Sequence, residues 1–144
     1  MNKEKIKIGI LGCGRVCEHY IQKILIPERV GNLYEVVAVC DVDIKKSTYV
    51  ANIFSCKAYD NIQQFVQQKN MEVVVILTKS GQHYEHSKIC LSNYLNVIVE
   101  KPLALRIDNV QELINISAEN GKFCASIFQN RLNPAVVATK NAFE

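Results

Sequence analysis

Short apolar runs that suit β-strands alternate with helical patterns along the whole of this 144-residue chain. Such alternation places the strands parallel to one another, with right-handed crossovers and helices on both faces of the sheet. The run Val73–Leu77 is apolar at every position, as expected for a central strand that is buried on both faces. The pattern predicts one α/β domain over residues 1–144, built on a doubly wound parallel sheet.

Six strands and the helices between them account for the pattern, and their spacing matches the strand order 3-2-1-4-5-6 of the Rossmann fold. The strands are expected at Lys5–Gly9, Glu35–Cys40, Cys56–Tyr59, Val73–Leu77, Val97–Val99 and Phe123–Phe128. The helices are expected at Val16–Leu25, Ile44–Phe54, Asp60 to about Asn70, Tyr84–Asn93, Asp108 to about Asn120, and from Pro134 onward. The expected helix boundaries are capping boxes at Asp60/Gln63 and Asp108/Gln111, breaks at Pro27 and Gly31-Asn32, and a stop at Gly121.

A glycine-rich turn follows the first strand and opens the first helix. Gly12 and Gly14 fill two positions of the G-x-G-x-x-G pattern, and Cys17 holds the third, where a small residue lets the helix pack on the strand. Gly12 allows the tight turn, and Gly14 lets the backbone approach a pyrophosphate. The amides of Arg15 and Val16 then face the phosphates with the helix dipole behind them. The turn predicts a dinucleotide site.

A carboxylate, Asp41, follows the second strand, where a dinucleotide site needs one. Its oxygens can accept hydrogen bonds from the adenosine ribose hydroxyls, and its charge repels a 2′-phosphate, which favours NAD over NADP. Lys45 and Lys46 lie close enough to leave NADP open. The competing interpretation is a glycine turn and a surface Asp in another α/β fold. The strand, turn, helix and carboxylate in this order favour the dinucleotide site.

The six cysteines mostly lie in apolar segments, which predicts buried, reduced thiols in a cytoplasmic protein. They are Cys13, Cys17, Cys40, Cys56, Cys90 and Cys124. The two that bracket the glycine turn suggest either a redox switch or small residues chosen for packing, and packing is favoured. The cysteines and histidines have no metal-ligand spacing, so no metal is expected.

The charge and hydropathy patterns argue against two classes of partner. The net charge is +3, and the basic residues are scattered rather than gathered in a stripe with aromatics, so no nucleic acid partner is expected. The longest apolar runs are too short to span a bilayer, and the chain begins without an apolar signal region, so no membrane partner is expected.

Three polar segments follow the fourth, fifth and sixth predicted strands. In chain order they are Thr78-Lys79-Ser80-Gly81-Gln82-His83, Glu100-Lys101-Pro102-Leu103-Ala104 and Gln129-Asn130-Arg131-Leu132-Asn133-Pro134. Ligands of open α/β folds bind at the carboxyl ends of the strands. Taken singly, each segment has a plainer interpretation: His83 as a helix start, Lys101 as a surface lysine, and Arg131 as a partner of a phosphate or of Glu144. Their placement at three strand ends favours a shared site.

The chain resembles the Gfo/Idh/MocA family on the Glu-Lys-Pro tripeptide after a Val-rich strand and the upstream Thr-x-x-x-x-His. Within it, the Gln-Asn-Arg-x-Asn-Pro segment is most similar to nucleotide-sugar 3-dehydrogenases that act on UDP-N-acetylglucosaminuronic acid. The resemblance implies hydride transfer from a sugar hydroxyl to NAD. One departure is Lys79, where the family usually has Pro.

The resemblance also assigns roles to matching positions. Cofactor-binding positions are Thr78, Ser80, His83, Glu100 near the nicotinamide ribose, and Gln129. Lys101 is the implied catalytic residue at the reacting hydroxyl and also touches cofactor and substrate, and its bond to Pro102 is often cis in the family. Asn130 and Arg131 border the substrate.

Members of this family continue into a second, substrate-binding domain, and the resemblance implies that residues 1–144 correspond to the first domain only. The resemblance therefore implies an NAD-dependent sugar dehydrogenase fragment that is inactive alone and a homo-oligomer when full length. The alternative is a free-standing dinucleotide-binding module without catalysis.

Overall fold

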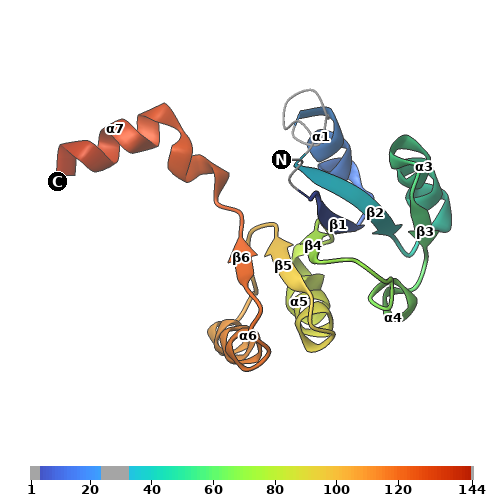
Figure 1. Ribbon diagram of the computed structural model, residues 1–144. Helices are drawn as coiled ribbons and strands as arrows, with labels where there is room; N and C mark the ends of the chain where they lie inside the picture. The colour runs from blue at the N-terminus through green and yellow to red at the C-terminus, as the bar shows by residue number, and fades with distance from the viewer. Residues whose placement is uncertain (1–3, 24–32, 144) are drawn as a thin grey trace.

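The sheet contains six parallel strands in the order β3-β2-β1-β4-β5-β6, which confirms the predicted Rossmann topology (Figure 1). The computed structural model describes residues 4–23 and 33–143. The strands are β1 (Ile6–Leu11), β2 (Tyr34–Cys40), β3 (Lys57–Tyr59), β4 (Val73–Ile76), β5 (Asn96–Val99) and β6 (Cys124–Ser126). The helices are α1 (Arg15–Lys23), α3 (Ile44–Phe54), α4 (Ile62–Phe65), α5 (His83–Ser92), α6 (Ile107–Glu119) and α7 (Pro134–Phe143). Two short 3-10 turns complete the structure, η1 (Ser80–Gln82) and η2 (Gln129–Leu132).

Strand β1 lies at the centre of the sheet, with β2 on one side and β4 on the other. Ile8 is paired with Val36 of β2 and with Val73 of β4, and the β1–β2 register shifts between Ile8 and Gly9. All four residues of β4 are buried, as its unbroken apolar sequence predicts. Because every strand is parallel, the carboxyl ends of β1, β2, β4 and β5 meet at one edge.

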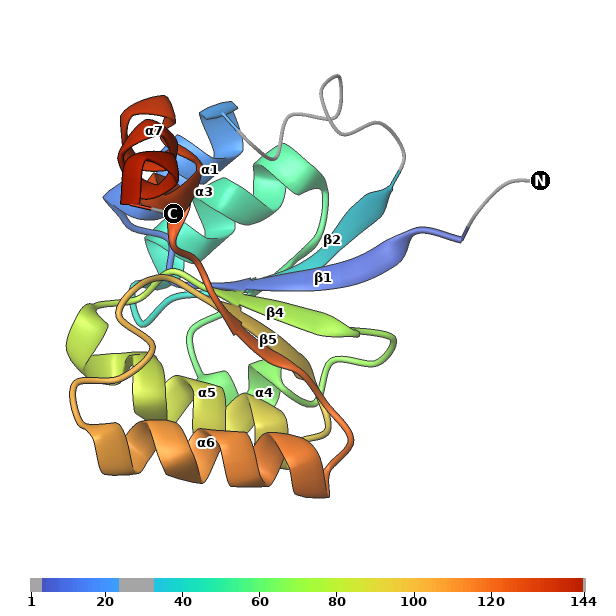
Figure 2. The same cartoon turned by 90° about the vertical axis from the view of Figure 1, so that its left-hand side faces the viewer.

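Two hydrophobic cores cover the two faces of the sheet (Figure 2). On one face α1 and α3 pack through buried residues such as Cys17, Tyr20 and Val50. On the other face α4, α5 and α6 contribute Phe65, Leu91 and Leu113, which are all inaccessible to solvent. These layers hold the strand ends rigidly, and the loops that follow them carry the polar residues.

Close packing around Gly9 predicts a large stability loss on a small substitution. A Cβ atom at this position would lie 2.2 Å from the sulfur of Met71 and 2.7 Å from Phe65. Gly9→Ala is expected to lower the free energy of unfolding by about 1–3 kcal/mol, the usual cost of overpacking a core. Urea denaturation of the variant measures this loss.

Gly81→Ala is the matched control, because a Cβ atom there meets nothing within 4 Å. Equal stabilities of the two variants would contradict the packing described for β1.

The predicted capping box at Asp60 and Gln63 is wrong by one residue. The cap of α4 is Asn61, whose side-chain oxygen accepts hydrogen bonds from the amides of Gln63 (2.8 Å) and Gln64 (3.3 Å). The helix also ends at Phe65, well short of the predicted end near Asn70. Asn70 adopts a left-handed conformation with φ 65°, which turns the chain toward β4.

The capping box predicted at Asp108 and Gln111 is also wrong. Arg106 precedes α6, and Asp108 lies inside the first turn, where its carboxylate accepts a hydrogen bond from the Arg106 guanidinium at 3.2 Å. The predicted stop at Gly121 is confirmed by its φ of 61°. The end predicted for the first helix at Leu25 and the breaks at Pro27 and Gly31-Asn32 lie outside the described residues.

Helix α7 begins at Pro134 as predicted, and the Asn133 side chain accepts the Ala135 amide hydrogen bond at 2.9 Å. It extends away from the sheet beyond η2 (Figure 1). In the described part of the chain, every helix is too short or too polar to cross a bilayer.

Candidate dinucleotide site

A cleft of about 750 Å³ opens at the carboxyl edge of the sheet, a size typical of small-molecule sites. It runs from the loop after β2, past the glycine turn after β1, to the loop after β4. Its lining includes seven residues predicted from the sequence to bind the cofactor: Gly12, Gly14, Arg15, Val16, Asp41, Thr78 and Ser80. Three separate strand ends therefore contribute to one cavity, as the Rossmann topology requires.

The glycine turn adopts the tight geometry predicted for it. Gly12 has φ 98°, and its amide donates to the Cys40 carbonyl at 2.8 Å. A Cβ atom on Gly12 would lie 2.8 Å from backbone atoms of Leu77 and Thr78, so only glycine fits between the ends of β1 and β4. Helix α1 starts at Arg15. The first amides of a helix have no partner within it and bind anions readily.

Gly14 supplies the direct test of whether a dinucleotide fits. A Cβ atom added there would meet no protein atom within 4 Å, and its φ lies outside the left-handed range. The fold therefore does not require glycine at this position. Gly14 nevertheless lines the cleft at the N-terminus of α1. Space kept free beside a helix N-terminus suits a pyrophosphate, so the residues present fit the dinucleotide.

Asp41 lines the cleft and also organises its rim. One carboxylate oxygen accepts the Cys13 amide hydrogen bond at 2.7 Å, and the other accepts that of Asp43 at 2.9 Å. Asp43 in turn caps α3 by accepting from the Lys45 amide at 3.0 Å. Each carboxylate oxygen keeps a further lone pair for a ribose hydroxyl. The carboxylate thus joins the loop after β2 to the glycine turn, which the sequence pattern did not show.

Helix α5, which follows the loop after β4, brings a residue to the cleft that sequence reasoning missed. His86 lines the cavity, and its Nδ1 lies 3.0 Å from the Thr78 hydroxyl. Burial lowers the pKa of His86 below the usual histidine value, and neighbouring His83 acts in the same direction. The ring is therefore neutral at pH 7 and can both donate and accept hydrogen bonds. Its position one helical turn after His83 was the available signal.

His83 itself lies beneath the cleft instead of lining it. Its side chain is 1% exposed, and both ring nitrogens contact backbone carbonyls. The loop after β4 lines the cleft with Thr78, Lys79, Ser80 and Gln82 instead. Of the two residues that define the Thr-x-x-x-x-His pattern, Thr78 lines the cleft and His83 is buried beneath it.

The Glu-Lys-Pro segment follows β5 on the same edge of the sheet, outside the residues that line the cleft. Glu100 accepts a 2.6 Å hydrogen bond from the Tyr20 hydroxyl through one oxygen and the Lys101 amide through the other at 3.1 Å. Burial and then the bond to Glu100 raise the pKa of Tyr20, so its phenol stays protonated and donates. Lys101 is exposed, and its peptide bond to Pro102 is cis, as the family resemblance implied.

The third predicted segment remains apart from the cleft. Gln129, Asn130 and Arg131 form the exposed turn η2 between β6 and α7. The structure does not bring these three side chains to the cofactor residues, so their assigned roles stay predictions.

The two cysteines beside the glycine turn have the features of packing residues. Cys13 is 5% exposed and Cys17 is fully buried. A hydrogen bond to Cys17 and burial raise the pKa of the Cys13 thiol, which keeps it protonated and unreactive. All six cysteines are free thiols, and four are buried.

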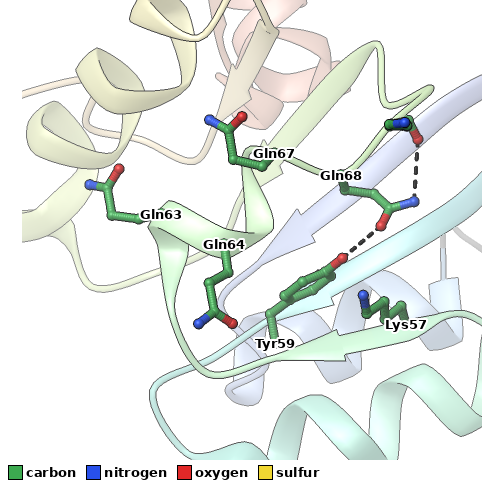
Figure 3. Close-up of a pocket in the computed structure, with 7 residues that line it drawn as sticks. Lys57, Tyr59, Gln63, Gln64, Gln67 and Gln68 are labelled. Carbon is green, nitrogen blue, oxygen red and sulfur yellow. Dashed lines mark hydrogen bonds between the residues drawn. The ribbon is translucent and has the colours of Figure 1, made fainter.

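A second, shallower hollow lies beside β3 and α4 and shares no residue with the cleft (Figure 3). Four glutamines and two lysines surround Tyr59, whose hydroxyl donates to Gln68 at 2.6 Å. The Lys57 ammonium lies 5.0 Å from the centre of the Tyr59 ring. None of the residues predicted to bind cofactor or substrate lies here. No group of three or more metal-ligating side chains occurs among residues 4–23 and 33–143.

Comparisons with known proteins agree with the Rossmann fold and with NAD as the cofactor. Residues 6–128 match the oxidoreductase family Gfo/Idh/MocA, described as having an NAD-binding Rossmann fold. Inositol 2-dehydrogenase of Salmonella typhimurium is 28% identical over 142 residues, which cover 96% of this chain and 41% of the enzyme. Trans-1,2-dihydrobenzene-1,2-diol dehydrogenase of Xenopus laevis is 29% identical over 129 residues, 89% of this chain and 38% of the enzyme.

Among solved structures, the WlbA dehydrogenase from Bordetella pertussis, in complex with NADH and UDP-GlcNAcA, superposes with a TM-score of 0.87. It is 25% identical, and the match covers 97% of this chain and 42% of that one. The Chromobacterium violaceum WlbA dehydrogenase shares the fold with a TM-score of 0.88 at 24% identity, over 99% of this chain and 40% of that one. The present chain thus spans about two fifths of the length of these relatives.

The family match covers the sheet, the glycine turn, the cleft and the Glu-Lys-Pro segment together. The chain belongs to the Gfo/Idh/MocA family of oxidoreductases and is an NAD-binding Rossmann domain.

Proposed function

We propose that this domain belongs to an NAD-dependent dehydrogenase that oxidises a hydroxyl group of a sugar or polyol. The observation that carries the proposal is the joint placement of the dinucleotide cleft and Lys101 at one edge of the sheet. The relatives support this reaction class, since both inositol 2-dehydrogenase and the dihydrodiol dehydrogenase are named as dehydrogenases of hydroxylated rings.

Different residues of the chain are proposed to bind the cofactor and to transfer the proton. The amides of Arg15 and Val16 bind the pyrophosphate, and Asp41 holds the adenosine ribose. NAD accepts the hydride when bound. A proton must leave the hydroxyl as the hydride leaves its carbon, and Lys101 is the residue proposed to accept or relay that proton. The bonds from Tyr20 and from the Lys101 amide fix the Glu100 carboxylate, which is assigned to the nicotinamide ribose.

For the substrate we propose a UDP-sugar acid oxidised at C3. The support is the Gln-Asn-Arg-x-Asn-Pro segment and the likeness to the Bordetella enzyme, whose structure holds UDP-GlcNAcA. The inositol dehydrogenases point to a cyclic polyol instead. NAD reduction by a polypeptide that carries this domain with its substrate domain distinguishes the two. UDP-N-acetylglucosaminuronic acid is expected to be the best substrate, and a preference for myo-inositol would overturn this assignment.

The remaining proposals concern the whole protein. We propose that residues 1–144 are the cofactor half of a two-domain, homo-oligomeric, cytoplasmic enzyme, and that this half alone does not turn over sugar. The free thiols agree with a reducing compartment. Both ring nitrogens of His83 contact backbone carbonyls, and His86 contacts the Thr78 hydroxyl through Nδ1.

A preference for NAD over NADP rests on Asp41, and Asp41→Asn tests it while preserving the side-chain shape. A hydrogen bond to a charged group contributes about 1.5–3 kcal/mol, so NAD binding is expected to weaken by roughly 10-fold or more. NADP binding should weaken less or improve, because the repulsion of its 2′-phosphate disappears. Isothermal titration with both cofactors measures the ratio.

Asp41→Ala is also expected to narrow the difference between the affinities for NAD and NADP. It should loosen the glycine turn as well, since the Cys13 amide loses its hydrogen-bond acceptor. Asp108→Asn, on the distant helix α6, is the control and should leave both affinities unchanged. An unchanged NAD-to-NADP ratio in Asp41→Asn would refute the role of this carboxylate.

A further inference from the structure

The buried histidine at the start of α5 connects two loops that meet near the proposed reaction centre. The Nδ1 atom of His83 lies 2.7 Å from the Pro102 carbonyl oxygen, and its Nε2 lies 2.9 Å from the Thr78 carbonyl oxygen. The side chain is 1% exposed, so water does not compete for these contacts. Thr78 lines the cofactor cleft, and Pro102 directly follows Lys101.

The two contacts determine which nitrogens of the His83 ring carry protons. A carbonyl oxygen only accepts hydrogen bonds, so each contact requires a proton on the ring nitrogen that faces it. A ring that carries both protons satisfies both contacts. Because Pro102 belongs to the segment after β5, the Nδ1–H is the donor that holds this segment.

The segment that carries Lys101 is held from both sides. On its N-terminal side, Tyr20 fixes the Glu100 carboxylate, which accepts the Lys101 amide hydrogen bond. On its C-terminal side, the contact from His83 fixes the Pro102 carbonyl. The lysine side chain itself is exposed, so its direction depends on the backbone that carries it.

We propose that His83 is a positioning residue, whose Nδ1–H donates to the Pro102 carbonyl and thereby sets the position of Lys101 relative to the cofactor. This inference rests on the proposed role of Lys101. It assigns His83 a role through the lysine segment in place of direct contact with the cofactor.

The first measurement concerns the ring itself. NMR of the chain labelled with ¹⁵N-histidine reports whether Nδ1 carries a proton, and the His83 signals are identified by their loss in His83→Gln. A protonated Nδ1 is expected, with its proton protected from exchange. An unprotonated Nδ1 in the folded wild-type chain overturns the proposal.

The second measurement follows Lys101 with a matched pair of variants. In His83→Asn, the side-chain amide nitrogen takes the place of Nδ1 and should keep the hydrogen bond to Pro102. In His83→Gln, the side-chain amide nitrogen takes the place of Nε2 and should keep only the hydrogen bond to Thr78. Lysines are methylated with ¹³C-formaldehyde, and the Lys101 signal is assigned from its absence in Lys101→Arg.

Addition of NAD is expected to shift the Lys101 signal in the wild type and in His83→Asn, and this shift is lost in His83→Gln. Equal shifts in the two variants, or a loss in both, overturn the positioning role. If NAD binds the wild type but leaves the Lys101 signal unmoved, the proposed function of Lys101 fails, and the inference fails with it. The wild-type result thus separates the two failures.

Discussion

Gly14→Val is expected to abolish detectable NAD binding while leaving the fold intact. No protein atom lies within 4 Å of a Cβ atom at this position, so the branched side chain stands in the cleft without straining the core. It occupies the approach to the helix N-terminus, where the pyrophosphate is proposed to bind. Titration of NADH, followed by its fluorescence, measures binding, and thermal unfolding measures stability.

The expected stability change is within about 0.5 kcal/mol, as for surface substitutions. Gly81→Val is the matched control, because Gly81 is equally open but does not line the cleft. It should bind NADH like the wild type. Gly12→Ala is expected to lose both binding and stability, since its Cβ atom would collide with backbone of Leu77 and Thr78. Normal NADH binding by Gly14→Val would mean that the cofactor lies elsewhere.

Lys101→Ala, in a polypeptide that includes the substrate domain, is expected to lower kcat by about 10²–10⁴-fold, the usual contribution of a general acid or base. The dissociation constant of NADH should change little, because Lys101 lies outside the residues that line the cleft. NAD reduction with the best sugar substrate measures kcat. Lys101→Arg should not restore activity, since a guanidinium stays protonated and is planar.

Lys69→Ala is the control for loss of a lysine, because this residue lies beside α4 and away from the cleft. Its kcat should equal that of the wild type. Full activity of Lys101→Ala would remove the chemistry assigned to this residue and leave the cofactor assignment standing.

The sheet, and the part of the site formed by the glycine turn and Asp41, can be predicted from local sequence patterns. The unbroken apolar run of β4 and the regular spacing of strands and helices are enough to predict the strand order. Gly12 and Asp41 were predictable because their roles depend on their places immediately after β1 and β2. Both residues lie in the lining of the cleft, where the pattern expects them.

Contacts between distant segments were not predictable. Tyr20 and Glu100 are 80 residues apart, and nothing in either segment indicates that the phenol donates to that carboxylate. The inward orientation of His83 depends on where the Pro102 carbonyl lies, which only the packed fold determines. At α4 the sequence pattern predicted a cap at Asp60, and the fold uses the next residue, Asn61, which the pattern alone did not indicate.

The most direct test of whether NAD binds in this cleft is an NMR titration of the wild-type chain with NAD, followed through backbone amide shifts. We predict saturable binding with the largest shifts at Gly14 to Val16, at Asp41, and at Thr78 to Ser80, the residues that line the cleft. Shifts confined to the glutamine-lined hollow around Tyr59, or no saturable shifts at all, would contradict the assignment of this cleft as the NAD site.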